Sequence, residues 1–568
     1  MNYVTNLDRQ MPPKDLASLP MELLSLIFLE LGLEDILNAR TVCRSMHTAS
    51  CARQVWSCLV VKSLGQSLPR PFFLPKPLQE CSSLDIENSI RRWEADWTPK
   101  SPLQTTRRPV VKELEEEANM PRCLSICMVP GGQFVLAGLT DGSVWSFDIS
   151  DDWTSTSSVE AKLLIPSSFP PSEGTETVIA TIRLAIDYIS EEALGPNHGA
   201  CYLSQFNIAV IACPTDNKSS NTHVGVWRVH LSQPTSEHPS GRQAMRLGEC
   251  LSSFKDSRTA LLNGASLLGK DLAYSMNFNP TGCTVIVNWE EAHGKTEGDE
   301  LLRWYIPDTE ATTVHLLPGD RIFVEAGNFI GIFNWPLHCP TSTLSSRRQR
   351  LWPIHYPWFR VLKDSQVPGI AISPPPLILQ GTIRLVVPTP GEAFSLIIPI
   401  DDYDLESIRF QSLLKAEFGF ASNQEVFGNR RAVGVNLRDH GNNFLYAAQY
   451  RFPGDATTPY SPKFQRQPHD TVDPTPELTN FTAHLAHKLC HIKFRTRLLY
   501  DQYTNRIVQT DHHITYFITV SSYASHTIDP GKSSVPSSEI QRIGSVGEGC
   551  MEDYNGESES EVGWGSSE

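Results

Sequence analysis

Histidine side chains near the C-terminus are the strongest candidates for chemistry in this chain. His484, His487 and His491 recur at intervals of three and four residues, so on a helix they would share one face and could bind a metal ion. The segment LCHIKFRTRLLY, which contains the last of them, instead alternates in the manner of a β-strand. A strand would separate the three imidazoles, and we therefore predict that the chain binds no metal.

Motifs of the common enzyme classes are missing from the sequence. It contains no Gly-rich phosphate loop ending in Lys-Ser or Lys-Thr, no G-x-S-x-G and no H-E-x-x-H. The acidic group Asp401, Asp402 and Asp404 is interpreted as the cap of a helix that begins near Leu405. We predict a protein that is not an enzyme and needs no cofactor.

The composition is that of a globular protein rich in turns. The 568 residues are 40% hydrophobic and 20% charged, with 41 prolines and 35 glycines, which favours short strands joined by turns over a helical bundle. The net charge is −15, and seven acidic side chains lie in 543–568, where there is no Lys or Arg. Nucleic-acid binding needs clustered basic side chains, so we expect no nucleic-acid partner. We expect 531–568 to be a disordered acidic tail.

The sequence also bears on the compartment in which the protein works. Residues 1–15, expected to be flexible, lack the apolar region of a secretory signal, and no run approaches the roughly 18 to 20 apolar residues of a membrane span. The 13 cysteines form no tight framework, and Cys123 and Cys127 fit a strand with buried thiols. We expect a protein of the cytoplasm, the nucleus or both, with no membrane partner.

Four short helices are predicted in residues 16–62. Pro20 suits the first position of a helix, and Gly32 is expected to end that helix in a left-handed conformation. Further helices are predicted over LEDILNAR, from about Thr41, and around Trp56. A module of this size excludes little water alone, so we expect a partner to complete its core. One inward apolar face is assigned to the first helix: Leu23, Leu24, Ile27, Phe28 and Leu31.

The order of these features resembles the F-box, the helical module by which ubiquitin-ligase receptors hold a Skp-type adaptor. The match runs from a Leu-Pro pair to a tryptophan, with Met46 in place of the family's aromatic residue and Gln54 in place of its acidic one. The resemblance implies an adaptor, and through it a cullin and a RING protein, as partners. It also implies a set of adaptor-binding residues: Leu19, Pro20, Leu24, Ile27, Phe28, Leu31, Val42, Cys43 and Trp56.

Residues 63–121 are predicted to link this module to the rest of the chain. Four prolines in 64–80 exclude a long helix there, and residues 98–121 are predicted to be polar and partly flexible. Between them, a connecting helix is predicted at about 83–97. Its expected features are a capping pair, Ser82 and Asp85, and one apolar stripe, Ile86, Ile90, Trp93 and Trp97.

A hairpin repeats through residues 122–530. Each copy has an apolar strand, a polar turn and a second strand, and the clearest is GQFVLAGLTDGSVWSFDIS with its Asp141-Gly142 turn. Seven copies begin near 133, 207, 284, 321, 382, 431 and 506, at intervals of 37 to 77 residues. Such a repeat is typical of propeller blades. We therefore predict a degenerate seven-bladed β-propeller, with a β-sandwich or two smaller β domains as the alternative.

The second strands of these hairpins resemble the ending of WD repeats. Phe147-Asp148, Trp227-Arg228 and Phe333-Asn334 stand in place of the Trp-Asp pair, and Trp304-Tyr305 does so loosely. The expected fold is thus a small all-α F-box followed by a large all-β, WD-like domain. The resemblance implies the substrate-recognition subunit of a Skp–cullin–F-box ubiquitin ligase, which binds a protein target through its β domain. The alternative is an F-box scaffold protein that acts outside cullin complexes.

Overall fold

The computed structural model describes most of the chain between residues 16 and 522. The described residues are 16, 19–64, 67–69, 72–94, 103–111, 122–149, 158–169, 180–194, 201–214, 221–232, 244–256, 262–278, 281–295, 301–307, 311–326, 329–335, 358–362, 375–379, 381–389, 392–401, 407–415, 425–428, 431–437, 443–450, 452, 481–483, 496–502, 504, 506–511 and 513–522. No helix among them is long and apolar enough to cross a membrane. The predicted segments 1–15 and 531–568, the three spaced histidines and the helix expected near Leu405 lie outside them.

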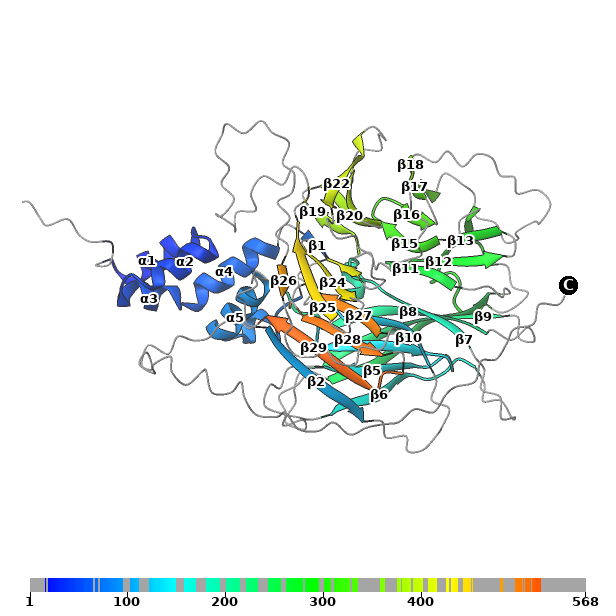
Figure 1. The fold of residues 1–568 in the computed structure, drawn as a ribbon, viewed down its shortest axis with the longest axis horizontal. Coiled ribbons are helices and arrows are strands. Elements are labelled where there is room, and N and C mark those ends of the chain that lie inside the picture. The colour runs from blue at the N-terminus through cyan, green and yellow to red at the C-terminus, as the bar shows by residue number, and fades with distance from the viewer. Residues whose placement is uncertain are drawn as a thin grey trace, which may run out of the picture. The chain divides into compact units, whose positions relative to one another are not determined.

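The four predicted N-terminal helices are present (Figure 1). They are α1 (Met21–Leu29), α2 (Leu33–Arg40), α3 (Arg44–Ser50) and α4 (Arg53–Leu64). Pro20 was predicted at the first position of the helix, but it is the N-cap residue, one position earlier, with a ψ of 148° that is not helical. The expectation for Gly32 was wrong: its φ of −76° is extended rather than left-handed, and it caps the start of α2. The turn between the two helices closes through Glu30, whose N–H donates to the carbonyl of Ile27.

The connecting helix is also present. Strand β1 (Ser67–Leu68) and the short helix η2 (Leu78–Glu80) lead to α5 (Ser83–Glu94). The predicted capping pair is confirmed, because the Ser82 N–H donates to a carboxylate oxygen of Asp85 at 2.9 Å and the Asp85 N–H donates to Ser82 Oγ at 3.2 Å. Ile86 and Ile90 are buried as expected, whereas Trp97 lies outside the described residues.

Six sheets in the described residues make up the large domain, and they form seven four-stranded blades, as the hairpin repeat predicted. The eight-stranded sheet holds two blades, and the five-stranded sheet is one blade with β1 added at its edge. We call them blades 1 to 7; within each, consecutive strands pair antiparallel. Blade 1 holds β3 (Cys123–Met128), β4 (Phe134–Leu139), β5 (Val144–Asp148) and β6 (Val159–Ile165); blade 2 holds β7 (Ala180–Ile186), β8 (Gln205–Pro214), β9 (Thr222–Ser232) and β10 (Ala244–Asp256); blade 3 holds β11 (Leu262–Leu268), β12 (Asp271–Phe278), β13 (Thr281–Asn288) and β14 (Trp304–Pro307). Blade 4 holds β15 (Ala311–Leu317), β16 (Arg321–Ala326), β17 (Phe329–Asn334) and β18 (Trp358–Val361); blade 5 holds β19 (Leu377–Leu379), β20 (Thr382–Thr389), β21 (Glu392–Pro399) and β22 (Arg409–Lys415). Blade 6 holds β23 (Glu425–Phe427), β24 (Arg431–Leu437), β25 (Asn443–Gln449) and β26 (Phe481–Ala483); blade 7 holds β27 (Thr496–Asp501), β28 (Arg506–Asp511), β29 (Tyr516–Ser522) and β2 (Leu103–Val111).

The first strands of successive blades lie beside one another at five of the seven junctions between blades in the described residues, which is the arrangement of a β-propeller. Contacts join β3 to β7, β7 to β11, β11 to β15, β23 to β27, and β27 back to β3. Side-chain hydroxyls bridge some of these neighbours, since Ser125 Oγ accepts from the Leu184 N–H and Ser266 Oγ from the Leu316 N–H. A seven-bladed, WD-like propeller is therefore the fold of the large domain.

Strand β2 closes the ring and corrects the predicted linker. Residues 103–111, which the sequence assigned to a polar and partly flexible stretch, pair antiparallel with β29 from Leu103↔Ser522 to Pro109↔Tyr516. The far end of β2 pairs in parallel with β6 of blade 1, at Val110↔Val159. An early strand thus completes the last blade, which protects the edges that an open sheet would expose. The large domain begins at about 103 rather than 122.

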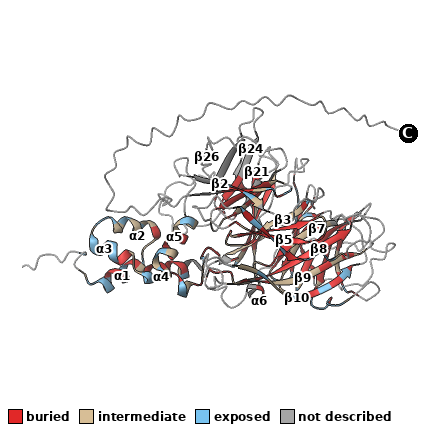
Figure 2. Ribbon diagram, turned by 90° about the horizontal axis from the view of Figure 1, so that it is seen from below, coloured by how far each residue is buried: buried red, intermediate tan, exposed pale blue. Residues whose placement is uncertain are grey.

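The hairpin register was correct for six of the seven copies. In these six, the predicted hairpin is the second and third strand of a blade, for example β4 and β5 or β28 and β29. The copy that begins near 284 is instead the third and fourth strand of blade 3, so Trp304-Tyr305 lies in β14 and not in a third strand. Strand β8, for example, is buried from Phe206 to Pro214 (Figure 2), because neighbouring blades cover both faces.

Candidate functional site

Helix α1 is apolar around almost its whole circumference. Seven of its nine residues are hydrophobic, and a helix of this kind is normally buried on all sides. Here Leu24 and Phe28 are buried in the core of the helical module, whereas Leu23, Leu26 and Ile27 are exposed. The single inward face predicted for this helix was therefore wrong, since the helix has one buried and one exposed apolar side.

Exposed apolar side chains are concentrated in this module. Of the twelve large hydrophobic residues exposed in the described part of the chain, seven lie within 16–61. Val42, at the turn between α2 and α3, is 67% exposed, and Leu26 is 53% exposed. Contiguous apolar surface of this kind marks interaction sites in soluble proteins. We call the following residues the docking face: Leu16, Met21, Leu23, Leu26, Ile27 and Val42.

The nine residues implied by the resemblance divide into three groups. Pro20, Ile27 and Val42 are exposed, and Leu19, Leu31 and Cys43 are half-buried against the module core. Leu24, Phe28 and Trp56 are buried, with Trp56 fully enclosed, so they form the core beneath the docking face rather than the face itself. Four docking-face residues were missed: Leu16, Met21, Leu23 and Leu26. For the missed residues of α1, the sequence did contain a signal, because the helix has more apolar residues than one face can hold.

The core of the module is completed from within the chain, which corrects the expectation that a partner completes it. Ile86 and Ile90 of α5, together with Phe73 and Leu74, belong to the same buried cluster as Trp56. Met46, the departure from the family's aromatic residue, is buried in this cluster as well: Leu24, Phe28, Leu33, Ile36, Met46, Ala49, Val55, Trp56, Leu59, Val60, Phe73, Leu74, Cys81, Ile86, Ile90 and Cys201. A partner is therefore needed to cover the docking face and not to fill the core.

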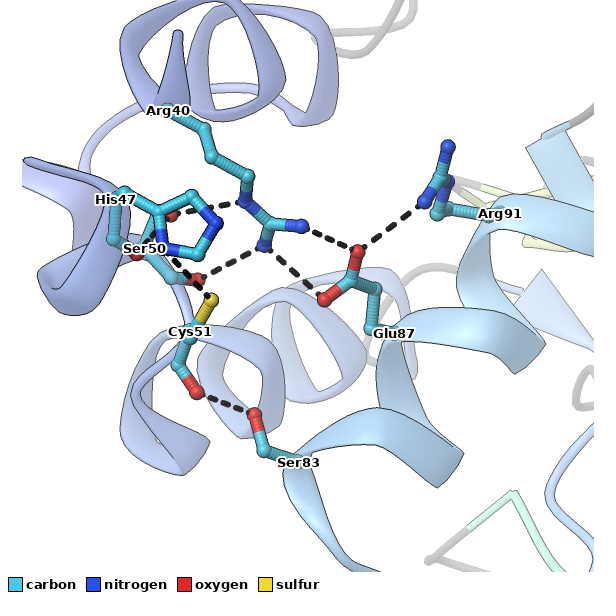
Figure 3. A network of polar contacts seen from close by, with 7 residues as sticks. All are labelled: Arg40, His47, Ser50, Cys51, Ser83, Glu87 and Arg91. Carbon is cyan, nitrogen blue, oxygen red and sulfur yellow. Dashed lines mark hydrogen bonds and ion pairs between the residues drawn. The ribbon is translucent and has the colours of Figure 1, made fainter. Parts of the chain in front are cut away.

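A buried ion-pair network joins α2 to α5 (Figure 3). Glu87, only 5% exposed, accepts hydrogen bonds from both terminal nitrogens of Arg40, at 2.7 and 3.0 Å. Arg91, one turn along α5, lies 3.3 Å from the same carboxylate. Arg40 also donates to Ser50 Oγ and stacks over the ring of Trp56 at 5.6 Å. These contacts fix the connecting helix against the helices that carry the docking face.

The segment before α5 is bound to the propeller at separate points. Ser67 and Leu68 of β1 pair antiparallel with Leu379 and Ile378 of β19, on the side of β19 away from β20. The Leu74 N–H donates to the carbonyl of Cys201, between α6 (Glu191–Leu194) and β8. Phe72 is buried in the cluster between blades 1 and 2: Phe72, Val129, Phe134, Leu136, Val144, Leu164, Ile165, Ile182, Ile186, Leu203, Phe206, Ile208, Val210, Ala212, Val229 and Leu231. The connection is thus integrated into the fold.

Metal and thiol chemistry has no support in the described residues. Among them, no group of three or more His, Cys, Asp and Glu side chains is placed to hold a metal ion. His484, His487 and His491 lie outside the described residues, so their assignment stays a prediction. Cys123 and Cys127 lie in β3 as predicted, and burial raises the pKa of the first to about 11 and of the second to about 12. Thiols held protonated in this way are poor nucleophiles.

Comparison with known proteins identifies the helical module. Residues 16–62 match the F-box-like family model. The matched residues include the docking face, helices α1 to α3, and α4 except for its last two residues. The match confirms the resemblance drawn from the sequence. No curated protein matches the chain.

Solved structures similar to this chain are β-propellers. They include the RRP9 WD40 repeats (TM-score 0.34, 9% identity, 74% of this chain and all of that one). They also include U3-55K (TM-score 0.34, 8% identity, 73% of this chain and 98% of that one). A third is the Cps50 (Swd1) β-propeller domain of Myceliophteria thermophila (TM-score 0.36, 11% identity, 72% of this chain and 97% of that one). At these low scores the propeller assignment rests on the seven blades of the chain itself.

Proposed function

We propose that this protein is the substrate-recognition subunit of a Skp–cullin–F-box ubiquitin ligase. The observation that carries the proposal is the exposed apolar side of α1, which lies within the F-box-like residues 16–62. A Skp-type adaptor would cover this face and, through a cullin and a RING protein, connect the chain to the catalytic subunits. The chain itself contributes no reacting group in this proposal.

The propeller would present the protein target in this assembly. Propellers and F-boxes are interaction domains, and the fold places both in one chain. Because β1, Phe72 and Leu74 bind the connection to the propeller, the connection would limit how far the docking face can move from the blades. Holding a target lysine near the ubiquitin donor raises its effective concentration, which is the contribution expected of a receptor. We place this activity in the cytoplasm, the nucleus or both.

Capture of a purified Skp-type adaptor by the full-length chain tests the docking face. Leu26→Asp with Val42→Asp changes the most exposed large apolar side chain of α1 and that of the turn between α2 and α3. The exposed fractions of Leu26 and Val42 together amount to about one complete side chain, which the adaptor would bury. Losing that apolar burial in the complex should cost about 2 to 3 kcal/mol, or roughly 30- to 150-fold in adaptor affinity. The buried core beneath them stays intact, so thermal unfolding should be unchanged.

The matched control is Leu84→Asp, on α5 and outside the F-box-like residues, where leucine is 52% exposed. It should leave adaptor capture unchanged. Equal capture by the double variant and the control would refute the assignment of the docking face. Capture of the adaptor without co-purification of cullin from cell extract would instead support the scaffold alternative over the ligase.

A further inference from the structure

Arg40 joins four helices through one side chain. It lies at the end of α2, donates to Ser50 Oγ of α3 at 3.0 Å and lies over the ring of Trp56 of α4 at 5.6 Å. Its two terminal nitrogens donate to the carboxylate of Glu87 in α5 (Figure 3). These partners are themselves held in place, since Ser50 and Trp56 are fully buried and Glu87 is 5% exposed. The guanidinium therefore sets where the end of α2 lies relative to the other three helices.

The turn of the docking face begins directly after Arg40. Val42, which is 67% exposed, lies two residues later in the chain. Its N–H donates back to the carbonyl of Ala39 in α2 at 3.1 Å. This bond makes the turn continuous with α2, so Val42 moves with the end of that helix. The position of Val42 relative to the exposed side of α1 therefore depends on how Arg40 is held.

Glu87 holds Arg40 from outside the F-box-like residues 16–62. Its two carboxylate oxygens lie 2.7 and 3.0 Å from the two terminal nitrogens of Arg40. A bidentate pair of this kind fixes orientation as well as distance. Arg91 lies 3.3 Å from the same carboxylate but belongs to α5 itself, so it connects no further helix. The pair of Arg40 and Glu87 is thus a direct charged link between α5 and the turn of the docking face.

Helix α5 extends this link to the connecting segment. Trp93 of α5 stacks on Phe73, with ring centroids 5.3 Å apart. The N–H of the next residue, Leu74, donates to the carbonyl of Cys201 before β8. Packed and hydrogen-bonded groups therefore run without interruption from the docking-face turn to the connection. A contiguous set of this kind is the physical basis on which two sites can be coupled.

We propose that Arg40 and Glu87 are positioning residues for adaptor docking, because they hold the turn that carries Val42 in the place that the adaptor contacts. Adaptor binding and the packing of α5 then depend on each other. An adaptor on the docking face stabilises α5, and a packed α5 favours adaptor binding, as thermodynamic reciprocity requires. The identity of the partner rests on the proposed receptor function.

Titration calorimetry with a purified Skp-type adaptor and the full-length chain tests the positioning role. Glu87→Gln should weaken adaptor binding by roughly fivefold or more, because affinity falls with the fraction of molecules whose turn is correctly placed. Arg91→Met is the matched control: it removes a contact to the same carboxylate within α5 and should change affinity by less than about twofold. Glu87→Asp keeps the charge and should recover most of the loss. Equal affinities of Glu87→Gln and the unchanged chain would overturn the proposal.

Hydrogen exchange of the unchanged chain is a second measurement, which needs no variant. At an adaptor concentration of about 100 times the Kd, complete linkage raises the protection of α5 amides roughly 100-fold, and we expect about tenfold or more. In Glu87→Gln the increase should fall below about threefold, with blades 3 to 5 unaffected in both chains. An ion pair with only a structural role would leave α5 exchange the same with and without adaptor, and that result overturns the proposal.

The positioning role and the receptor function fail in different ways. An unchanged chain that does not bind the adaptor refutes the receptor function, and the positioning role with it. Adaptor binding that Glu87→Gln leaves as strong refutes the positioning role alone. Leu84→Asp, on the exposed side of α5, separates indirect from direct action. Weaker adaptor binding by this variant would show that α5 contacts the adaptor itself, which overturns an action through the turn.

Discussion

Glu87 is predicted to hold the connecting helix against the helical module. Its carboxylate is buried and accepts two hydrogen bonds from Arg40 and one from Arg91. Glu87→Gln keeps the volume of the side chain and removes its charge, so the perturbation is electrostatic. The guanidinium of Arg40, whose side chain is 18% exposed, then loses its counter-charge in a mostly desolvated position.

The magnitude follows from the burial of the two partners. Breaking a fully buried ion pair on one side costs about 3 to 5 kcal/mol. Arg40 retains some contact with water and its hydrogen bond to Ser50, and glutamine still offers one oxygen, so we expect a loss of about 1.5 to 3 kcal/mol. Arg91→Met removes a single contact of 3.3 Å from a more exposed partner and should cost under about 1 kcal/mol.

Hydrogen exchange of the full-length chain, followed by mass spectrometry, measures this loss locally. A chain with two domains does not unfold in one step, so a single melting temperature would obscure the effect. Amides of α5 and α2 should lose protection by roughly 10- to 150-fold in Glu87→Gln, with blades 3 to 5 unchanged. If Glu87→Gln lowers protection no more than Arg91→Met does, the buried pair is not what fixes α5.

Two further predictions concern the propeller. Burial, assisted by the charge of Asp320, raises the pKa of Asp271 to about 6. The folded state therefore binds this proton more tightly than the unfolded state does, and the stability of the fold falls as pH rises from about 4 to about 6. In calorimetry, Asp271→Asn should stabilise the chain by about 1 to 2 kcal/mol at pH 7.5 but not at pH 4. Asp256, at the end of β10 in blade 2, is buried between Arg303 at 2.8 Å and the hydroxyl of Tyr274 in blade 3 at 2.6 Å. Arg303→Leu should lower the free energy of unfolding by about 3 to 5 kcal/mol and Tyr274→Phe by about 1 to 2, and equal losses would contradict the unequal roles of charge and hydroxyl.

Local sequence signals were sufficient for the blades because a hairpin is specified by neighbouring residues. Asp141-Gly142 produces its turn with a positive φ at the glycine, and β4 and β5 follow from the apolar runs on either side. Strand β2 gave no such signal. Its partner, β29, lies more than 400 residues later in the chain, and Pro109 with two preceding arginines is atypical of a strand. Only the closed ring creates a place for it.

The docking face shows the same limit for a functional site. The spacing of Leu23, Leu24, Ile27 and Phe28 is compatible with a single helix face, and periodicity cannot say how much of that face the core accepts. The module core takes Leu24 and Phe28 because α3 and α4 pack there, and it leaves Leu23 and Ile27 outside. Exposure is a property of the assembled helices, so the sequence identified the module correctly and divided its residues incorrectly.

The path of the connecting segment sets a constraint on how the two functions of the chain are combined. Strand β1 occupies the axial side of β19, the first strand of blade 5, while Leu74 hydrogen-bonds beside blade 2 and Phe72 packs between blades 1 and 2. These residues lie at the ends of the first strands, close to the turns that lead into the second strands. The last strand of each blade lies at the other side of its sheet from the first strand. A target bound along those last strands would therefore not compete with the segment that holds the docking face.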